Sequence, residues 1–507
     1  MYLLGIDVGT SGVKALLISD KGEFTAESLH TYPLLSPNPG WFEQNPDDWW
    51  DAAVKSIRDI LAKAAVEPGQ IAGIGLSGQY HGSVLLGKDN GILRPAILWN
   101  DQRTQLQSDR IIERAGSENL LRLACTGGAP YFTACKLEWV RDNEPDVYER
   151  VCKLILPKDY VRFKLTGVIA TDVSDASGTL FLDVPNRCWS EELVGLIGAK
   201  KTILPGLFES PVVSGTVTPE AARATGLPSG IPVAGGAGDQ ASAAIGNGIV
   251  DEGIVTYSIG TSGVIYAATD SPRSDPGGRA NTFCHAVPGR WCLLACINAA
   301  AGSLQWFQEK LADAERAEAE QTGRNVYELL MDMAASVSPG SDRLLFVPYL
   351  SGERHPHTDT NARGVFFGLH MGHGRDHMLR AVLEGVAYAF KDCLEVMREL
   401  GVSIHEIRAT GGGAKSDLWL GIQANVSNEP IYTMAADEGG AAYGAALLGG
   451  VCASVFGSVR EACDKLVRTA RSLKPDRDKV DIYDRLFRFY RTLYPLFRES
   501  YKDLQSL

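Results

Sequence analysis

The chain has 507 residues, of which 45% are hydrophobic and 22% are charged, and its formal net charge is -12. This length is too great for one ordinary hydrophobic core, so the sequence predicts two or more globular domains. The negative charge argues against a nucleic-acid or anionic-membrane surface, because the phosphates of either would repel the molecule. Ten scattered cysteines without a C-x-x-C pair, the lack of a long apolar run and an N-terminus without signal-peptide features together predict a cytoplasmic protein with reduced thiols.

The first 18 residues read as a β-hairpin, with strands at about 2–6 and 13–18. The turn between them carries Asp7, Thr10 and Ser11 among glycines. Glycines let backbone N–H groups approach an oxyanion, and an aspartate beside them can face the metal that accompanies a phosphate. An Asp-Gly hairpin turn is also common for conformational reasons alone.

Two polar patches follow apolar strands in the first half of the chain. One spans residues 77–82 and contains Tyr80 and His81, and the other spans 98–103 and contains Asp101. Amide, imidazole and carboxylate groups at strand ends suit a ligand rich in hydroxyl groups. Taken alone, His81 is better explained as a hydrogen-bonded loop histidine than as a ligand contact.

A glycine-rich corner at residues 233–248 surrounds a single acid, Asp239, which is followed by Gln240 and a helix of small residues. In an open α/β sheet, ligands bind where strand ends turn into helices, so this carboxylate is well placed to contact a small molecule. The alternative is that Asp239 only caps a tightly packed helix.

The chain then repeats its first motif. Residues 260–264 are identical to residues 9–13 and also stand between two apolar strands, so Gly260 and Thr261 match Gly9 and Thr10. An internal repeat predicts two related domains, at 1–248 and 249–507, each offering a phosphate-binding hairpin to a shared cleft. The position of Asp7 is taken by Ser258 in the second copy.

A third glycine turn, at residues 410–417, contains Gly413 and Asp417 and stands between a predicted strand and a predicted helix. This arrangement is typical of a nucleotide corner, although its spacing matches neither a Walker A loop nor G-x-G-x-x-G. Residues 439–446 are small and mirror the helix after Asp239, which indicates a paired helix at the domain junction. The aromatic and charged segment after residue 460 predicts a helix that packs across the other domain.

These motifs, in this order, resemble the FGGY family of carbohydrate kinases, and within it the xylulokinase subfamily. The resemblance covers essentially the whole chain. It includes the hairpin at residue 7, its copy at 260, the Gly-Asp-Gln at 238–240 and the triple glycine at 411–413. Longer matching stretches are residues 41–44, 49–50, 94–101, 156–160, 283–286 and 349–354.

The resemblance implies two ribonuclease-H-like α/β domains of the actin/Hsp70/sugar-kinase superfamily with ATP in the cleft between them. It further implies Mg²⁺ as cofactor, transfer of a phosphoryl group to D-xylulose, and a homodimer. Asp239 would be the general base, with an ordinary pKa near 4. The other implied roles are a magnesium–phosphate contact for Asp7, phosphate or nucleotide contacts for Thr10, Ser11, Gly260, Thr261, Gln305, Gly413 and Asp417, and sugar contacts for Tyr80, His81, Asp101 and Gln240.

Tyr80 and Gln240 depart from the residues usual at these positions in xylulokinases, where methionine and asparagine are common. Both changes affect sugar contacts. The sequence therefore defines the type of reaction better than it defines which sugar is the substrate. The alternatives left open are an FGGY kinase for ribulose, gluconate or glycerol, and a non-catalytic actin-like ATP-binding protein.

Overall fold

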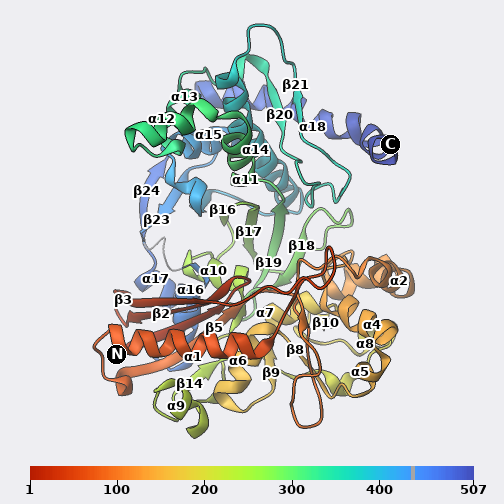
Figure 1. Ribbon diagram of the computed structural model, residues 1–507, viewed down its shortest axis with the longest axis vertical. Coiled ribbons are helices and arrows are strands. Elements are labelled where there is room, and N and C mark those ends of the chain that lie inside the picture. The colour runs from red at the N-terminus through yellow and green to blue at the C-terminus, as the bar shows by residue number, and fades with distance from the viewer. Residues whose placement is uncertain (436–439) are drawn as a thin grey trace.

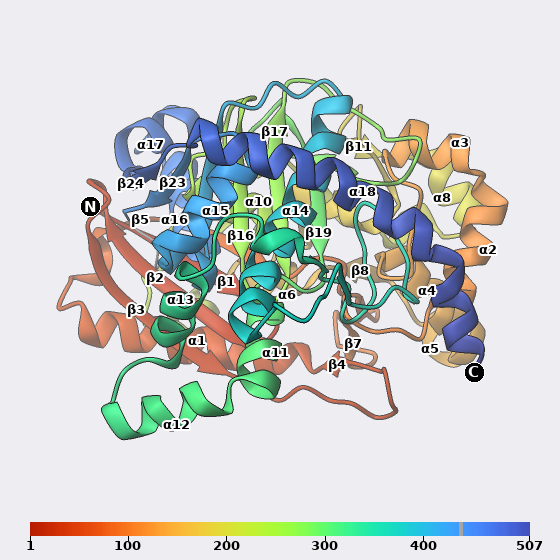
Figure 2. The same ribbon diagram turned by 90° about the horizontal axis from the view of Figure 1, so that it is seen from above.

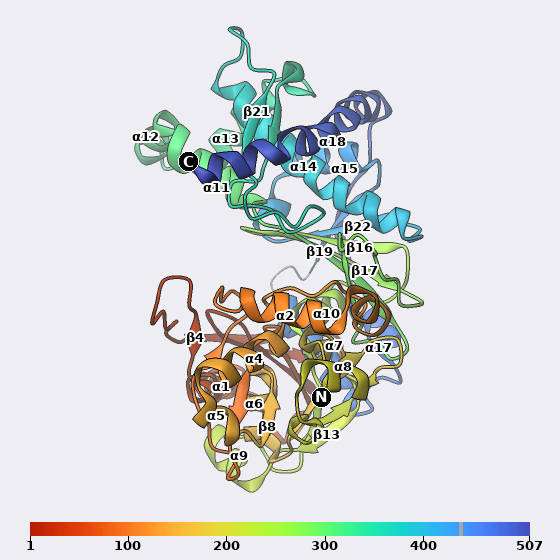
Figure 3. The same cartoon turned by 90° about the vertical axis from the view of Figure 1, so that its right-hand side faces the viewer.

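The computed structural model describes residues 1–435 and 440–507, which form two lobes, each built on a seven-stranded sheet (Figures 1 and 3). The first sheet has the order β13-β14-β5-β1-β2-β3, and the short β15 pairs with β5 beside β14. Its strands are β1 (Tyr2–Val8), β2 (Gly12–Ser19), β3 (Phe24–Thr31), β5 (Ile71–Gly78), β13 (Val213–Thr216), β14 (Pro232–Ala234) and β15 (Ala237–Gly238).

The second sheet, of order β18-β19-β17-β16-β22-β23-β24, repeats the core of the first. In each lobe an antiparallel hairpin, β1–β2 or β16–β17, is joined by a parallel strand, β5 or β22, on the side of its first strand. The duplication predicted from residues 9–13 and 260–264 is therefore present in the fold. The strands are β16 (Ile254–Ile259), β17 (Gly263–Thr269), β18 (Asn281–Cys284), β19 (Trp291–Ile297), β22 (Glu406–Thr410), β23 (Ile431–Met434) and β24 (Thr469–Leu473).

Helices cover both sheets, and several short strand pairs lie between them. Helix α1 (Pro46–Lys63) begins at Asn45, whose side chain accepts a hydrogen bond from the Asp47 N–H, and it packs on β2 and β3. The other helices of the first lobe are α2 (Gln105–Ala115), α3 (Ser117–Asn119), α4 (Thr133–Asn143), α5 (Pro145–Glu149), α6 (Pro157–Thr166), α7 (Val173–Ala176), α8 (Glu191–Ile197), α9 (Pro219–Thr225) and α10 (Asp239–Gly246). The short pairs are β4 (Glu43–Gln44) with β7 (Ala96–Ile97), β6 (Val84–Leu86) with β8 (Lys153–Ile155), β9 (Ala170–Asp172) with β12 (Gly206–Phe208), β10 (Leu182–Asp183) with β11 (Cys188–Trp189), and β20 (Leu345–Val347) with β21 (Val365–Phe367).

The second lobe is organised around α14 (Arg375–Glu399), most of whose residues are buried. The 30-residue α18 (Arg477–Ser506) crosses this lobe and packs on α14 and α15 (Figure 2). For α18 the expectation of packing across the other lobe is therefore wrong, because its buried aromatic residues belong to the core of its own lobe. The remaining helices here are α11 (Ala301–Leu311), α12 (Asp313–Thr322), α13 (Val326–Ala335) and α15 (Asp417–Ser427). Among the described residues, no helix combines the length and the apolar character that crossing a membrane requires.

Two late helices, α16 (Gly440–Cys452) and α17 (Val459–Leu466), return to the first lobe, where α16 packs on β5, β1 and α10 (Figure 1). The packing is close because glycines face the helix backbone. A β-carbon on Gly5 would stand 1.9 Å from the Ala442 carbonyl oxygen, and one on Gly75 would stand 1.8 Å from that of Ala445. The predicted pairing of the two small-residue helices is thus present, although residue 439 lies outside the described part of the chain.

We expect Gly444→Ala to destabilise the protein by about 3 kcal/mol, because a β-carbon there would stand 1.8 Å from the Ser242 carbonyl oxygen of α10. The matched control is Gly195→Ala in the exposed interior of α8, where a β-carbon meets nothing within 4 Å. That change should leave stability equal or raise it by up to about 1 kcal/mol. Urea denaturation of both variants measures the difference, and equal midpoints would contradict the close packing of α10 on α16.

Candidate active site

Three parallel strands of the first sheet end side by side and carry the predicted catalytic groups. β5 lies between β1 and β15, and Ser77 of β5 is in register with Asp7 on one side and Ala237 on the other. The chain leaves β15 directly into α10, whose first residue is Asp239. Asp7 and Asp239 therefore lie at the same end of the sheet. The strands that lead to them are two strand spacings apart, which is about 10 Å.

Asp239 is half-buried, and its Oδ1 accepts a hydrogen bond of 2.7 Å from the backbone N–H of Gln240. Burial, with a further contribution from the negative charge of Asp7, raises the pKa of Asp239 to about 7. The ordinary value near 4 expected from the sequence is wrong, because composition gives no information on burial or on a second carboxylate across the sheet. A base with this pKa is matched to work near neutral pH.

A cavity of about 350 Å³ adjoins Asp239 and draws its walls from both lobes. Four of the predicted residues, Tyr80, His81, Asp239 and Gln240, line it together. The other lining residues are Trp99, Tyr131, Ser262, Val264, Asn281, Phe283, Leu294, Cys296, Ile297, Asn298, Ser351, Arg354 and His355. Aromatic faces combined with amide and hydroxyl groups are suited to a small polyhydroxylated ligand.

His81 is fixed as a neutral ring at the wall of this cavity. Its Nδ1 donates to the Gly178 carbonyl oxygen at 2.8 Å, and burial lowers its pKa to about 3. The ring therefore offers Nε2 as an acceptor. The backbone of His81 has a φ of 66°, a left-handed conformation that a residue other than glycine adopts only when its surroundings hold it there.

Tyr80 packs directly on the glycine that precedes Asp239. A β-carbon on Gly238 would stand 2.1 Å from the Tyr80 Cζ atom, and the Tyr80 hydroxyl has no hydrogen-bond partner among the described residues. Glycine at 238 is thus required by the approach of the Tyr80 ring. The unpartnered buried hydroxyl is available to a ligand.

Asp101 is not brought to the cavity. Its Oδ1 accepts from Arg103 Nε at 2.9 Å, and its Oδ2 accepts from Arg103 Nη2 at 2.7 Å and from the Phe42 N–H at 2.6 Å. The predicted sugar contact is corrected accordingly, because both oxygens are occupied within the protein. Its neighbour Trp99 reaches the cavity instead.

The first hairpin is tied to the wall of the cavity through Thr10. Its hydroxyl accepts from Trp99 Nε1 at 2.9 Å and donates to Gln79 Oε1 at 3.3 Å. Ser11, at the tip of the turn, is exposed. The turn thus combines a fixed threonine with a serine hydroxyl that has no hydrogen-bond partner in the described part of the chain.

The second hairpin is fixed to the start of α11. The carbonyl oxygen of Gly260 accepts from the Ala301 N–H at 2.8 Å, and that of Thr261 accepts from Ala300 at 2.9 Å. The third glycine turn lies against this hairpin, since a β-carbon on Gly411 would stand 2.9 Å from the Ile259 carbonyl oxygen. The close approach of the two backbones explains why this turn needs glycine.

A second cavity, of about 680 Å³, opens beside these two turns. The predicted nucleotide contacts Thr261, Gln305, Gly413 and Asp417 all line it. Its other lining residues are Ala301, Leu304, Asn325, Tyr327, Glu328, Met331, Asp332, Gly412, Lys415, Ser416, Leu418 and Trp419. Apolar walls beside a glycine corner and a helix start match the requirements of a nucleotide base and its ribose.

Asp7 fits the role of a magnesium-associated residue. Its Oδ1 is buried without a hydrogen-bond partner among the described residues, and burial raises its pKa although Ser77 and Lys14 oppose the shift. A buried carboxylate oxygen of this kind is stabilised by a nearby cation, and carboxylates are ligands that Mg²⁺ accepts.

A buried charged network supports the strand end that leads into Asp239. The Gly238 N–H donates to Ser174 Oγ at 3.2 Å, and this hydroxyl donates to Asp172 Oδ2 at 2.6 Å. Asp172 in turn pairs with Lys158 at 2.9 Å, and both side chains are fully buried. The position of Asp239 therefore depends on a network that the sequence reasoning missed.

The second wall of the 350 Å³ cavity was also missed, because β18, β19 and residues 351–355 reach the site only through packing of the two lobes. The only sign of this wall in the sequence was that the stretches 283–286 and 349–354 resemble the corresponding stretches of the family. No spacing rule linked either stretch to Asp239.

Comparison with known proteins identifies the family. Residues 2–246 match the N-terminal domain of the FGGY family of carbohydrate kinases, and residues 255–453 match its C-terminal domain. The chain is 38% identical over 505 residues to a xylulose kinase of Bacillus subtilis, covering 100% of this chain and 99% of the relative. A gluconokinase of Bacillus licheniformis is 30% identical over 507 residues, with 100% of this chain and 96% of the relative covered.

Among solved structures, a xylulose kinase from Rhodospirillum rubrum superposes with a TM-score of 0.92 at 32% identity, covering 99% of this chain and 100% of the other. Both lobes and their arrangement are therefore shared with a kinase of this family. With two family domains that together span most of the chain and full-length relatives above 30% identity, the protein belongs to the FGGY family of carbohydrate kinases.

Proposed function

We propose that the protein transfers the γ-phosphoryl group of ATP to D-xylulose, forming D-xylulose 5-phosphate, with Asp239 as the general base. The observation that carries this proposal is the position of Asp239. Its carboxylate lines the 350 Å³ cavity, has a pKa near 7, and stands across one strand from Asp7.

In this reaction Asp239 accepts the proton of the C5 hydroxyl as that oxygen bonds to the γ-phosphorus. The bond from the γ-phosphorus to the β-phosphate oxygen breaks, and ADP leaves. The transition state is loose, so alignment and charge neutralisation carry most of the catalysis. The backbone N–H groups and hydroxyls of the two hairpins neutralise the transferring group.

Mg²⁺ bound near Asp7 would neutralise charge on the phosphate oxygens. For the nucleotide itself, Gly413 and Asp417 would contact the adenosine end, with Gln305 beside them, since all three line the 680 Å³ cavity. Thr261 lines the same cavity and also belongs to the second hairpin, so it would contact the nucleotide between its adenosine end and its phosphates. Closure of the lobes would exclude water from the transferring phosphoryl group.

A second candidate acceptor is a sugar acid such as gluconate. Arg354 lines the same cavity, with its guanidinium carbon 5.5 Å from the ring centre of Trp99 and 5.4 Å from that of Tyr131. An arginine held among aromatic rings can bind a carboxylate by paired hydrogen bonds. Because one relative is a gluconokinase, gluconate has to be compared with D-xylulose as an acceptor.

The test is ADP release with Mg²⁺ and ATP across D-xylulose, D-ribulose, L-ribulose, gluconate and glycerol, with a reaction lacking sugar as background. We expect kcat/KM for D-xylulose to exceed that for every other acceptor by at least about tenfold. Preference for gluconate would assign the second candidate and implicate Arg354. An ATPase rate without sugar as high as the best rate with sugar would contradict the closure mechanism.

A further inference from the structure

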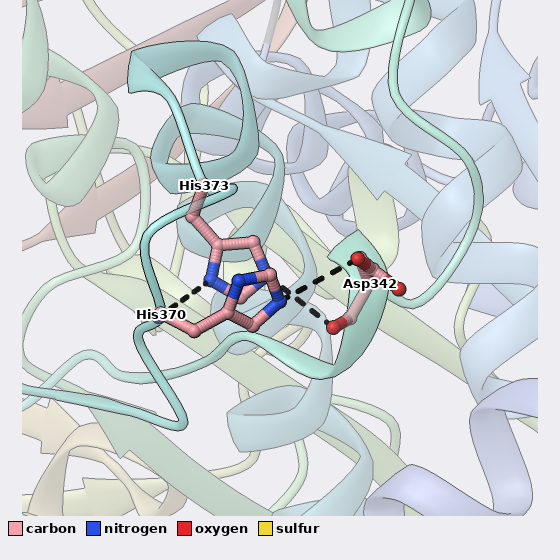
Figure 4. A group of neighbouring side chains, drawn as sticks. All are labelled: Asp342, His370 and His373. Carbon is pink, nitrogen blue, oxygen red and sulfur yellow. Dashed lines mark hydrogen bonds and ion pairs between the residues drawn. The ribbon is translucent and has the colours of Figure 1, made fainter.

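Two surface turns of the second lobe meet at a cluster of two histidines and an aspartate, far along the chain from the catalytic residues (Figure 4). Asp342 lies in the turn between α13 and β20, and His370 and His373 lie in the turn that precedes α14. One ligand atom from each of the three residues lies within 4.8 Å of the other two.

The contacts within the cluster bring nitrogen and oxygen donors to one point. His370 Nε2 stands 3.6 Å from Asp342 Oδ2, and His373 Nε2 stands 3.3 Å from the backbone carbonyl oxygen of Asp342. The ring centres of the two histidines are 3.7 Å apart. Asp342 and His370 are exposed, so small side-chain movements can shorten these separations to metal–ligand geometry.

We propose that Asp342, His370 and His373 bind one divalent transition-metal ion, with Zn²⁺ as the expected metal. Two imidazoles and one carboxylate are a ligand set that zinc accepts, and water completes the coordination of a site with three protein ligands. Mg²⁺ is disfavoured because it prefers oxygen ligands in octahedral geometry. This site is therefore chemically distinct from the magnesium site proposed at Asp7.

The neighbouring charges leave the three ligands available. His377 is engaged by Asp376, with His377 Nδ1 2.9 Å from Asp376 Oδ1, so it is not counted among the ligands. Arg375 faces away toward Glu315, at 3.0 Å.

The hydrogen bonds of the two rings set a limit on affinity. His370 Nδ1 accepts from the Gly372 N–H at 3.0 Å, and His373 Nδ1 accepts from the His370 N–H at 3.2 Å. The proton of each neutral ring therefore lies on Nε2, toward Asp342. A metal on Nε2 moves that proton to Nδ1 and displaces these two hydrogen bonds, so we expect a dissociation constant on the order of 10 µM rather than tighter binding.

The structural consequence is a link between two turns. Ser341, Asp342 and Arg343 have φ values of 46°, 50° and 71°, three consecutive non-glycine residues in the left-handed region. A bound ion would hold this turn against the start of α14, the central helix of the lobe. Binding to the folded state alone also raises its stability by mass action.

The experiment is calorimetric titration of Zn²⁺ into the full-length protein, prepared without a histidine tag and without nucleotide, with Mg²⁺ in excess. We expect one equivalent to bind with a dissociation constant on the order of 10 µM. His373→Gln and Asp342→Asn should each weaken binding at least about tenfold and abolish the rise in melting temperature caused by Zn²⁺. The matched control is His30→Gln, at a second histidine–aspartate pair, where His30 Nε2 lies 2.8 Å from Asp59 Oδ2, and it should bind Zn²⁺ as the wild type does.

Absorption of the Co²⁺-loaded protein separates this site from the exposed thiols of Cys152 and Cys188. A site of nitrogen and oxygen ligands gives visible d–d bands without the strong near-ultraviolet band of a cobalt–thiolate bond. A thiolate band, the lack of saturable binding, or unchanged affinity in His373→Gln and Asp342→Asn would each overturn the proposal.

Discussion

Asp239→Asn should lower kcat by about 10²- to 10⁴-fold, the contribution of a positioned general base. The amide keeps the size of the side chain but accepts no proton from the sugar hydroxyl. We expect the KM for sugar to change only a few-fold, because the cavity walls remain in place. Steady-state kinetics with the preferred acceptor measures both parameters.

The matched control is Asp109→Asn on the exposed face of α2, where the carboxylate accepts from Gln105 at 2.8 Å and from no other described residue. That variant should retain wild-type kinetics. A kcat for Asp239→Asn within about tenfold of the wild type would remove Asp239 from the role of base.

The raised pKa of Asp239 also predicts how the wild type responds to pH. Because only the ionised carboxylate accepts the proton, kcat/KM should fall about tenfold per pH unit below pH 7 and level off above it. Since kcat/KM reports the free enzyme, a cation near Asp7 in the complex would move the corresponding midpoint of kcat to lower pH. A flat kcat/KM profile between pH 5 and 8, with intact fold, would contradict the raised value.

The same shift has a defined sign for stability. The folded-state pKa of about 7 lies above the ordinary aspartate value of 3.8. The ionised carboxylate therefore destabilises the fold fully above pH 7 and not at all below pH 3.8. Asp239→Asn should therefore melt at a higher temperature than the wild type at pH 8. This advantage should shrink as the pH is lowered toward 4, and thermal melts at both pH values test it.

Lys158→Met is expected to destabilise the first lobe by about 3–5 kcal/mol, because it removes the cation that three buried carboxylates share. Lys158 Nζ contacts Asp159 at 2.7 Å, Asp172 at 2.9 Å and Asp175 at 3.3 Å, and all four side chains are fully buried. Burial alone would lower the pKa of Lys158, but the three carboxylates outweigh it and raise the pKa. Urea denaturation of the variant measures the loss.

Lys164→Met on the same helix, α6, is the matched control. Lys164 is partly exposed and stands 3.8 Å from Asp47, so its removal should cost no more than about 1 kcal/mol. Equal losses in the two variants would show that the buried network contributes nothing beyond a surface ion pair. Because Asp172 is linked through Ser174 to the Gly238 N–H, any Lys158→Met protein that folds should also show reduced kcat.

The sequence by itself determined the two glycine-containing hairpins, the third glycine turn and the acid at the glycine corner. These features are local: a turn needs its glycines, and the strands on each side need apolar residues, whatever lies elsewhere in the chain. The repeat at residue 260 extended this local information to a prediction of two similar lobes. The resemblance to FGGY kinases then assigned the reaction class, which the comparisons confirm.

Only the tertiary structure decided what each side chain faces. Asp101 follows a strand end just as His81 does, but Arg103 takes both of its oxygens. The pKa of Asp239 depends on burial and on Asp7, more than 200 residues earlier in the chain. Asp342 and His370 meet because β20, β21 and the start of α14 bring their two turns together. These outcomes depend on contacts between distant residues, and spacing along the chain gives no information on distances across a fold.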